Sequence, residues 1–463
     1  MGDRTRTCMA AVFEHKKLLL RACILNIESL ELHCRLLNLF TGGIGLKKTK
    51  KLFTVLHQCV CGIDVHQGNV VACLLKVDED GEYVDTIKTF STMTSQLQKL
   101  KTWLQEEGCK KVGMESTGVY WIPVFNVLEE GDFAITLSNA QQIKNVPGKK
   151  TDPNDSRWIS KLLAVGLVNG SFIPPREIRE LRTLTRYRDK LIGMRTSEKD
   201  RALNILESCN IKLNSVASDV FGVSGRAMMN QLIEHKSDID IENVANLAQK
   251  KMRKKIPELM EALNGKMDTH HAKLLKIVLD HLEYLNGQIK IIEAEIEEKC
   301  KPYQQVIELL DEIPGVSKVT AQSLIAEIGP DMSVFETPER LASWAGLSPG
   351  NNESAGKKKS TRIGPGNKYI KTKLCQCALA ASRTKNTYLA AKYYSIKGRR
   401  GGKKATIATA RHMLVSAFFI IRDKEHYKEL GGDYLLKLKS QNIVKSMAGR
   451  LKSLGYDIVK IAQ

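Results

Sequence analysis

The stretches CVCGIDV (residues 59–65), VVACLLKV (residues 70–77) and YVDTIKTF (residues 83–90) are short and rich in apolar and β-branched residues. Residues 66–69 and 78–81, which separate them, read HQGN and DEDG and are typical of turns. We therefore predict three consecutive strands joined by tight turns, beginning at Cys59.

Helical and strand-like segments alternate after these three strands. Leu97, Leu100 and Leu104 recur at helical spacing and predict a helix over residues 94–107. The segments that follow are a strand at 111–115, a helix at 119–130, a strand at 133–138 and a helix at 152–165. The order β-β-β-α-β-α-β-α predicts an α/β domain with a ribonuclease-H-like (RuvC-like) fold over residues 59–175.

The remaining chain divides into four predicted segments. Residues 1–58 lack clear periodicity, and we treat them as a poorly ordered extension that an early start codon would explain. Residues 176–302 are predicted to be helical, and Leu275 to Ile296 repeat at the heptad spacing of a coiled-coil seam. That seam fits packing within the chain or self-association into a homo-oligomer, a dimer or tetramer, about equally well.

Residues 303–425 predict a mainly helical C-terminal domain, and residues 426–463 a tail. Within the domain, the turn Ile313-Pro314-Gly315-Val316 leads into a helix at 319–328, as in a helix-hairpin-helix. Such turns present backbone amides to a phosphate, although many helical hairpins contain similar turns.

Charge is the strongest compositional signal in this chain of 463 residues. Lys and Arg number 71 against 51 Asp and Glu, a formal charge of +20. No acidic residue occurs between Glu353 and Asp423, whereas residues 357–404 hold 15 Lys and Arg. This segregation favours a polyanionic partner over a merely basic protein.

The composition also excludes several classes of protein. An apolar content of 43% with 12 Pro excludes global disorder. The longest apolar run, residues 413–421, is too short for a membrane span, and the 11 scattered Cys are typical of reduced thiols. We therefore expect a cytoplasmic protein without a membrane partner.

Four acidic residues occupy positions where a ribonuclease-H-like fold gathers its active site. Asp64 lies at the end of the first strand, Glu115 ends the fourth, and Asp152 and Asp155 open the last helix. Each alone fits a turn former or a helix cap, Asp152 especially. Together they predict a site for Mg²⁺, with Mn²⁺ as the alternative, because Mg²⁺ prefers oxygen ligands and activates phosphodiesters for attack.

Basic residues flank these acids and fill the C-terminal domain. We predict contacts to nucleic-acid phosphates from ten of them: Lys149, Lys150, Arg157, Lys357, Lys358, Lys359, Arg362, Lys368, Lys371 and Lys373. The adjacent His270 and His271 are interpreted as surface residues and are assigned no metal.

Three blocks around the acids, GIDVH (62–66), ESTGVY (115–120) and KTDPND (150–155), resemble the DEDD transposases of the IS-one-ten insertion-sequence family. A second set agrees independently: IPGV (313–316), WAGLSP (344–349), SAGK (354–357) and IGPGN (363–367) resemble that family's C-terminal transposase domain. The resemblance covers about residues 59–425.

The resemblance implies a site-specific DNA recombinase in which a noncoding bridge RNA pairs with target and donor DNA. It also implies a bacterial or archaeal protein associated with the nucleoid. It implies that the acidic cluster binds Mg²⁺ and that a serine attacks DNA to form a covalent phosphoserine. By position that serine is Ser354, with Ser360 as the alternative. Many members have Ser-Ser-Gly here, whereas this chain has Ser354-Ala355-Gly356.

Residue chemistry alone supports Ser354 only moderately, since a serine between two Asn and a Gly is ordinarily a loop residue. A serine hydroxyl is a weak nucleophile until it is activated, and no His is near it in sequence. Activation by the distant metal site would require a composite site across domains or subunits.

Three functions remain from the sequence. The first is a transposase that cleaves and rejoins DNA. The second is a Holliday-junction-type, Mg²⁺-dependent hydrolytic nuclease that uses the acids alone. The third is a nucleic-acid-binding scaffold whose catalysis has lapsed.

Overall fold

The computed structural model describes residues 56–78, 82–116, 118–138, 152–168, 170–236, 240–350, 352–354 and 357–456. At residues 152–154, 352–354, 357–359 and 441 it describes the backbone alone. Nearly all of the predicted extension, residues 1–58, lies outside these ranges. The chain forms two compact units, residues 1–173 and 174–463, each described separately below.

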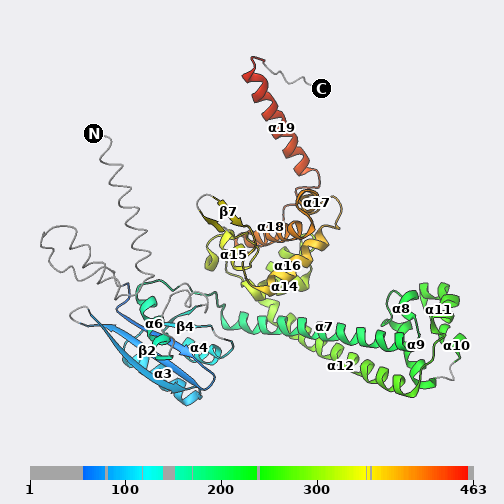
Figure 1. The fold of residues 1–463 in the computed structure, drawn as a ribbon, viewed down its shortest axis with the longest axis horizontal. Helices are drawn as coiled ribbons and strands as arrows, with labels where there is room; N and C mark the ends of the chain where they lie inside the picture. Colours follow the sequence, from blue (N-terminus) through cyan, green and yellow to red (C-terminus); the bar gives the residue numbers. More distant parts are fainter. Residues whose placement is uncertain are drawn as a thin grey trace. The chain divides into compact units, whose positions relative to one another are not determined.

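A five-stranded mixed sheet forms the centre of the first unit (Figure 1). Its strands are β1 (Cys59–Val65), β2 (Asn69–Val77), β3 (Tyr83–Ser91), β4 (Lys111–Glu115) and β5 (Ala134–Ser138). They lie in the order β3-β2-β1-β4-β5, with β1, β2 and β3 antiparallel and β4 and β5 parallel to β1. The predicted element order is confirmed, and this mixed sheet has the strand order of a ribonuclease-H-like fold.

Helices cover both faces of this sheet. On one face α3 (Thr94–Glu106) and α4 (Trp121–Glu129) enclose the main core, in which Ile63, Met114 and Leu104 are fully buried. On the other face lies α6 (Asp152–Ala164), whose Leu163 and Ala164 pack on Val60. Alternate residues of β1 therefore face different helices, as strand geometry requires.

The contact between α6 and the sheet is unusually close because β1 has a glycine there. A Cβ atom at Gly62 would lie 2.3 Å from the Ser156 carbonyl oxygen and 2.4 Å from the Ser160 nitrogen. The Ser160 hydroxyl accepts a hydrogen bond from the Gly62 N–H (2.8 Å) and donates one to the Cys73 carbonyl (2.6 Å). One buried hydroxyl thus joins α6 to both β1 and β2.

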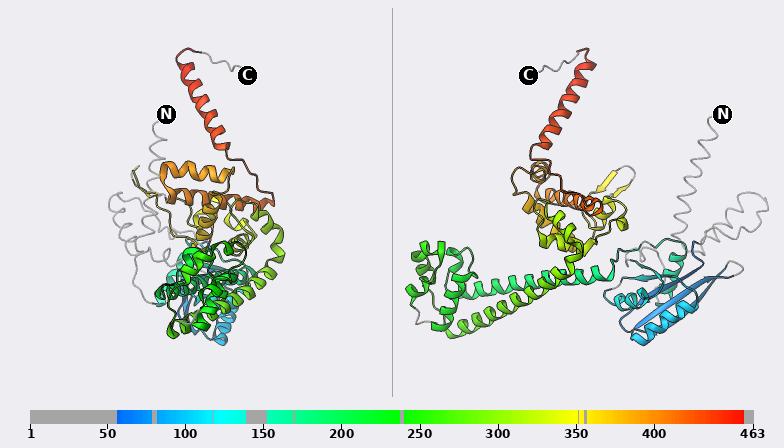
Figure 2. Two further views of the ribbon diagram at one scale, coloured as in Figure 1. Left: turned by 90° about the vertical axis from the view of Figure 1, so that its right-hand side faces the viewer. Right: turned by 180° about the vertical axis from the view of Figure 1, so that it is seen from behind.

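Two long helices, α7 (Arg176–Ser208) and α12 (Thr269–Cys300), begin the second unit and pack side by side (Figure 2). A small helical subdomain joins them, built from α8 (Leu213–Val216), α9 (Val223–His235), α10 (Ile241–Ala245) and α11 (Ile256–Leu263). It has its own apolar core, which includes Met228, Met229 and Leu259.

The heptad residues of α12 are used within the chain. Leu275, Leu282 and Leu285 are each at most 2% exposed, and Leu285 and Ile289 pack on Leu191 of α7. The intrachain interpretation of the seam is therefore confirmed. In the described residues α7 and the helical subdomain cover these side chains, and self-association of the chain stays a prediction.

The rest of the second unit is a helical core that carries one hairpin. Its elements are α13 (Gln304–Asp311), α14 (Lys318–Ile328), α15 (Pro338–Trp344), β6 (Asn352–Ser354), β7 (Lys357–Ser360), α16 (Lys368–Ala381), α17 (Tyr388–Arg400) and α18 (Gly402–Asp423). The helix α19 (Tyr434–Ser453) follows this core, and most of its described side chains are exposed. In the turn between α13 and α14, Gly315 has φ +87°, and a Cβ there would lie 2.5 Å from the Cys377 carbonyl oxygen. The turn thus packs directly on α16.

Among the described residues one helix, α18, is long and apolar enough to cross a membrane. Half of its apolar stretch is buried inside the protein, where Met413, Leu414 and Phe418 are at most 1% exposed. A packed core helix has the same composition, so this helix is weak evidence for a membrane span.

We predict that Gly62→Ala displaces α6 from the sheet, because the added methyl overlaps two backbone atoms. The opening free energy of β1 and α6 should fall by about 1–3 kcal/mol, seen as faster amide hydrogen exchange. Gly68→Ala is the matched control, since a Cβ there meets no atom within 4 Å. Equal exchange in both variants would contradict the close contact.

Candidate functional site

Asp64 and Glu115 lie on adjacent parallel strands at the same edge of the sheet. The register pairs Ile63 with Met114, so the two acids are the next residues on β1 and β4. Asp64 is 8% exposed and Glu115 is half-buried. Parallel strands bring these carboxyl ends together, and strand alternation places both acids on the face opposite Ile63 and Met114.

That face is the one covered by α6. Gly62 and Gly113, two residues before each acid, both meet the helix, since a Cβ at Gly113 would lie 3.2 Å from Ile159. The C-terminal end of α6 packs on the start of β1 through Leu163, so the helix runs antiparallel to β1 and β4. Its first turn therefore points to the edge that carries Asp64.

Asp155 lies one turn before Ile159, in the direction of Glu115. Four helical residues and two strand residues each advance about 6 Å, so Asp155 aligns with Glu115 as Ile159 does with Gly113. Asp152 is the first residue of α6, and its side chain lies outside the described residues. In the part of the chain that is described, no three His, Cys, Asp or Glu side chains form a ready-made metal site.

His66 is a further side chain at this edge. Its Nε2 lies 3.2 Å from a carboxylate oxygen of Asp64, and the imidazole is 42% exposed. It follows the end of β1, two residues beyond Asp64, and the contact with Asp64 places it at the same edge. The contact between His66 and Asp64 was not predicted from the sequence. Their separation by two residues was the signal that could have indicated it.

The basic residues predicted beside the acids fall into two groups. Arg157 donates two hydrogen bonds to one Asp85 oxygen on β3, from Nε (2.8 Å) and from an Nη atom (2.7 Å). Its charge therefore has a partner within the unit. Lys149 and Lys150 lie outside the described residues.

Ser354, the predicted nucleophile, is the last residue of β6 at the tip of a hairpin. It pairs with Lys357, while Ser360 pairs with Asn352 near the base. The Ser360 hydroxyl accepts a hydrogen bond from the Arg362 N–H at 3.1 Å. A turn interaction therefore already uses Ser360; the Ser354 side chain is outside the described residues.

Backbone contacts fix the base of this hairpin. Pro349 and Ile363 form a β-bridge, and the N–H of Gly350 donates to the Arg362 carbonyl at 3.1 Å. Below them Gly346 and Gly366 touch, since a Cβ at Gly366 would lie 2.3 Å from the Gly346 nitrogen. Only glycine allows these two segments of the backbone to approach this closely.

Asn367 connects the hairpin base to α16. Its side-chain oxygen accepts from the N–H groups of Tyr369 (2.9 Å) and Ile370 (3.3 Å), which caps the helix. Its amide nitrogen donates to Glu327 at 2.6 Å, and its backbone N–H donates to the Trp344 carbonyl at 3.1 Å.

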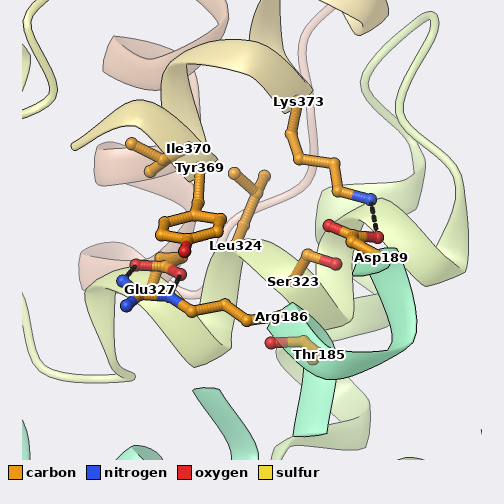
Figure 3. Close-up of a pocket in the computed structure, with 9 residues that line it drawn as sticks. All are labelled: Thr185, Arg186, Asp189, Ser323, Leu324, Glu327, Tyr369, Ile370 and Lys373. Carbon is orange, nitrogen blue, oxygen red and sulfur yellow. Dashed lines mark hydrogen bonds and ion pairs between the residues drawn. The ribbon is translucent and has the colours of Figure 1, made fainter. Parts of the chain in front are cut away.

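Glu327 on α14 is a buried carboxylate, 3% exposed, at the centre of an ion-pair network (Figure 3). Arg186 of α7 donates two hydrogen bonds to it, at 2.7 and 2.8 Å, and stacks over the Tyr369 ring at 4.0 Å. Arg182 donates to the carbonyls of Ala326 (3.1 Å) and Glu327 (2.6 Å). Burial lowers the pKa of Arg182 to about 10.

Lys373 lines a small pocket together with Glu327 and Arg186, and it is paired with an acidic residue of α7. Its ammonium lies 2.7 Å from the Asp189 carboxylate, and its side chain is 20% exposed. This pairing holds α16 to α7 and leaves Lys373 a poor phosphate contact. The pocket contains none of the predicted acids, and its charged groups compensate each other.

The other predicted phosphate contacts surround the hairpin. Arg362 and Lys368 are exposed and Lys371 is half-buried, whereas Lys357, Lys358 and Lys359 lie on β7 with side chains outside the described residues. Sequence reasoning missed Glu327 and Arg186, because nothing near either residue in sequence indicates their pairing.

Comparison with known proteins agrees with both units. Residues 61–211 match the family model of the DEDD transposases of IS110, described as a transposase. Residues 307–395 match the model described as "Transposase IS116/IS110/IS902 family", and together the two segments span about half of the chain. The chain belongs to the IS110 (IS-one-ten) family of transposases.

Other similar proteins cover smaller parts of the IS110-family chain. The "Insertion element IS900 uncharacterized 42 kDa protein" of Mycobacterium paratuberculosis is 28% identical over 146 residues, 31% of this chain and 36% of that protein. The chain thus matches about a third of that relative's length.

Two solved structures of RuvC from Thermus thermophilus, one with a Holliday junction substrate, each cover 24% of this chain and 99% of their own. Their identities are 11% and 10%, with TM-scores of 0.21 and 0.20. At these scores the sheet topology, rather than this likeness, identifies the fold of the IS110-family chain.

We predict that Glu327→Gln destabilises the helices around the hairpin base of the IS110-family chain, because it removes the counter-charge of the half-buried Arg182 and Arg186. The opening free energy of α14 and α16 should fall by about 3–5 kcal/mol, measured by hydrogen exchange. Glu336→Gln, which breaks an exposed pair with Arg340, should change it by less than about 1 kcal/mol. Equal effects would contradict a central role for Glu327.

Proposed function

We propose that this chain is the DNA transposase, a site-specific recombinase, of an insertion sequence. The observation that carries the proposal is the placement of Asp64, Glu115 and the first turn of α6 at one edge of a ribonuclease-H-like sheet. Acids on three separate segments are thereby brought toward one point, which supports phosphodiester chemistry better than a turn-forming role for each.

Asp64, Glu115, Asp152 and Asp155 would hold the divalent cation, Mg²⁺ or Mn²⁺. Their carboxylates are the oxygen ligands that such ions prefer, and a nearly buried carboxylate such as Asp64 gains from a compensating cation. A bound cation would neutralise the scissile phosphate and lower the pKa of the attacking hydroxyl.

Ser354 is the proposed nucleophile. A bond forms between its Oγ and phosphorus while the bond from phosphorus to a sugar oxygen breaks, and that oxygen takes up a proton. Rejoining reverses the step with a different sugar hydroxyl, so no external energy source is required. The hairpin base supports this role, because its backbone contacts fix the position from which the strand that ends at Ser354 starts.

The basic surface of the second unit would bind DNA and a noncoding bridge RNA that pairs with target and donor sequences. Assembly as a dimer or tetramer and a nucleoid-associated, cytoplasmic location are part of the same proposal. An element-encoded RNA among the nucleic acids that copurify with the chain would separate this function from a hydrolytic nuclease and from a lapsed scaffold.

We expect Asp64→Asn to abolish excision of the element from a plasmid, measured by amplification across the rejoined flanks, while binding to DNA persists. The variant removes the carboxylate charge but keeps the shape of the side chain. Glu130→Gln is the control, since Glu130 forms only a surface pair with Lys101. Excision at the control level by Asp64→Asn would overturn the acidic site.

We expect Ser354→Ala to eliminate protein-linked DNA while the fold and nucleic-acid binding persist, since a hairpin hydroxyl contributes little to stability. The measurement is a denaturing gel of protein incubated with labelled element DNA, copurified RNA and Mg²⁺. Ser360→Ala is the matched control and should retain the linked band. Loss of the band in Ser360→Ala alone would move the nucleophile to Ser360, and free cleaved ends without any band would favour the hydrolytic nuclease.

A further inference from the structure

Three basic side chains meet between α17 and α18, outside the residues assigned above. The two helices pack on each other and are joined by Gly401. Residues 388–421, which form them, contain no Asp or Glu. Lys392 of α17 faces Arg411 and His412 of α18.

The contacts within this cluster are short, and no acidic side chain in the described part of the chain forms an ion pair with it. The Lys392 ammonium donates to His412 Nδ1 at 3.0 Å and lies 3.3 Å from the Tyr388 hydroxyl. The Arg411 Nε is buried without a hydrogen-bond partner among the described residues. Because His412 accepts from Lys392, its imidazole is neutral.

The surrounding groups do not compensate the charge. Burial and then Arg411 lower the pKa of Lys392, and burial, Lys392 and Arg411 lower the pKa of His412 to about 4. Glu429, which approaches α17, accepts instead from the backbone N–H groups of Tyr388 (2.7 Å) and Gly431 (2.8 Å). Tyr427, near Tyr388, supplies no counter-charge either, because burial raises the pKa of its phenol, and Tyr434 meets the Tyr388 ring edge-on with centroids 5.7 Å apart.

We propose that Lys392, Arg411 and His412 form a binding site for a phosphodiester group of a nucleic-acid backbone. The site rests on the proposed function, because it serves nucleic-acid binding, but it requires no catalytic residue. All three side chains are half-buried, so each retains a solvent-facing part that a ligand reaches.

Phosphate chemistry fits this donor set. An anion supplies the acceptor oxygens that the Arg411 guanidinium and the Lys392 ammonium lack, and charge-assisted hydrogen bonds of this kind are the strong ones. Further basic residues follow toward Gly401, where α17 and α18 join. They are Lys397, Arg399 and Arg400 on α17, and Lys403 and Lys404 on α18. A backbone bound along these helices meets successive cations without any intervening acid.

A phosphate site and a purely structural contact predict different effects of Lys392 substitution on the melting temperature. If the hydrogen bond from Lys392 to His412 served mainly to join the helices, its removal would lower the melting temperature. As a phosphate site the cluster is strained by like charge in the free protein, so Lys392→Met, which keeps the apolar stem, should leave the melting temperature unchanged or raise it.

The test measures binding of the full-length protein to a fluorescent DNA duplex and to an RNA hairpin across a salt series. Lys392→Met should weaken binding to at least one of them and reduce the slope of log K against log salt by about 0.9 for duplex DNA. Arg411→Gln should act in the same direction. Lys276→Gln, which removes a lysine already paired with Asp280, is the charge-matched control and should leave the slope unchanged.

Comparison of the two probes identifies which nucleic acid supplies the phosphate. Weaker binding by the variants to only one probe assigns the site to that nucleic acid. Unchanged affinity and slope for both probes in Lys392→Met and Arg411→Gln, with normal binding by wild type, would overturn this site and leave the proposed function intact. Failure of wild type to bind either probe would overturn both.

Discussion

The hydrogen bonds of one buried hydroxyl determine where the first unit can carry out chemistry. Ser160 accepts from Gly62 on β1 and donates to Cys73 on β2, at a point where only glycine admits the helix. This contact fixes both the direction of α6 and its position along the strands. The first turn of α6 then lies at the edge where Asp64 and Glu115 stand near the C-terminal ends of β1 and β4. The proposed metal site therefore requires this contact as well as the acids themselves.

In the second unit an ion pair around the buried Glu327 positions the base of the hairpin. Glu327 holds Asn367, which caps α16 and closes the base of the hairpin that ends in Ser354. Arg186 balances the carboxylate from α7, so the long helices and the hairpin base share one network. Removal of Arg186 leaves the buried Glu327 carboxylate with a weaker counter-charge, and such networks are costly to break. In both units the candidate catalytic residues lie at or near the ends of strands and helices that buried contacts hold in position.

Local patterns were enough to predict much of this arrangement. Apolar alternation and turn residues predicted the five strands, and the acids stood out because they fall at strand ends and at a helix start. The partners of α12 could not be predicted, because a heptad seam has the same sequence whether it meets α7 or another subunit. The pairs Arg157–Asp85 and Lys373–Asp189 were equally hidden, since 72 and 184 residues separate their members. Charge composition alone makes such paired residues look free to bind phosphate.

The central claim is that β1, β4 and the first turn of α6 hold one divalent cation between them. Iron-mediated backbone cleavage tests it directly, with Fe²⁺ bound in place of Mg²⁺ to generate short-lived radicals at the site. The account predicts cuts near Asp64, Glu115 and Asp155 in the same protein, all suppressed by excess Mg²⁺. Cuts at only one of the three segments, or cuts that excess Mg²⁺ leaves unchanged, would contradict it.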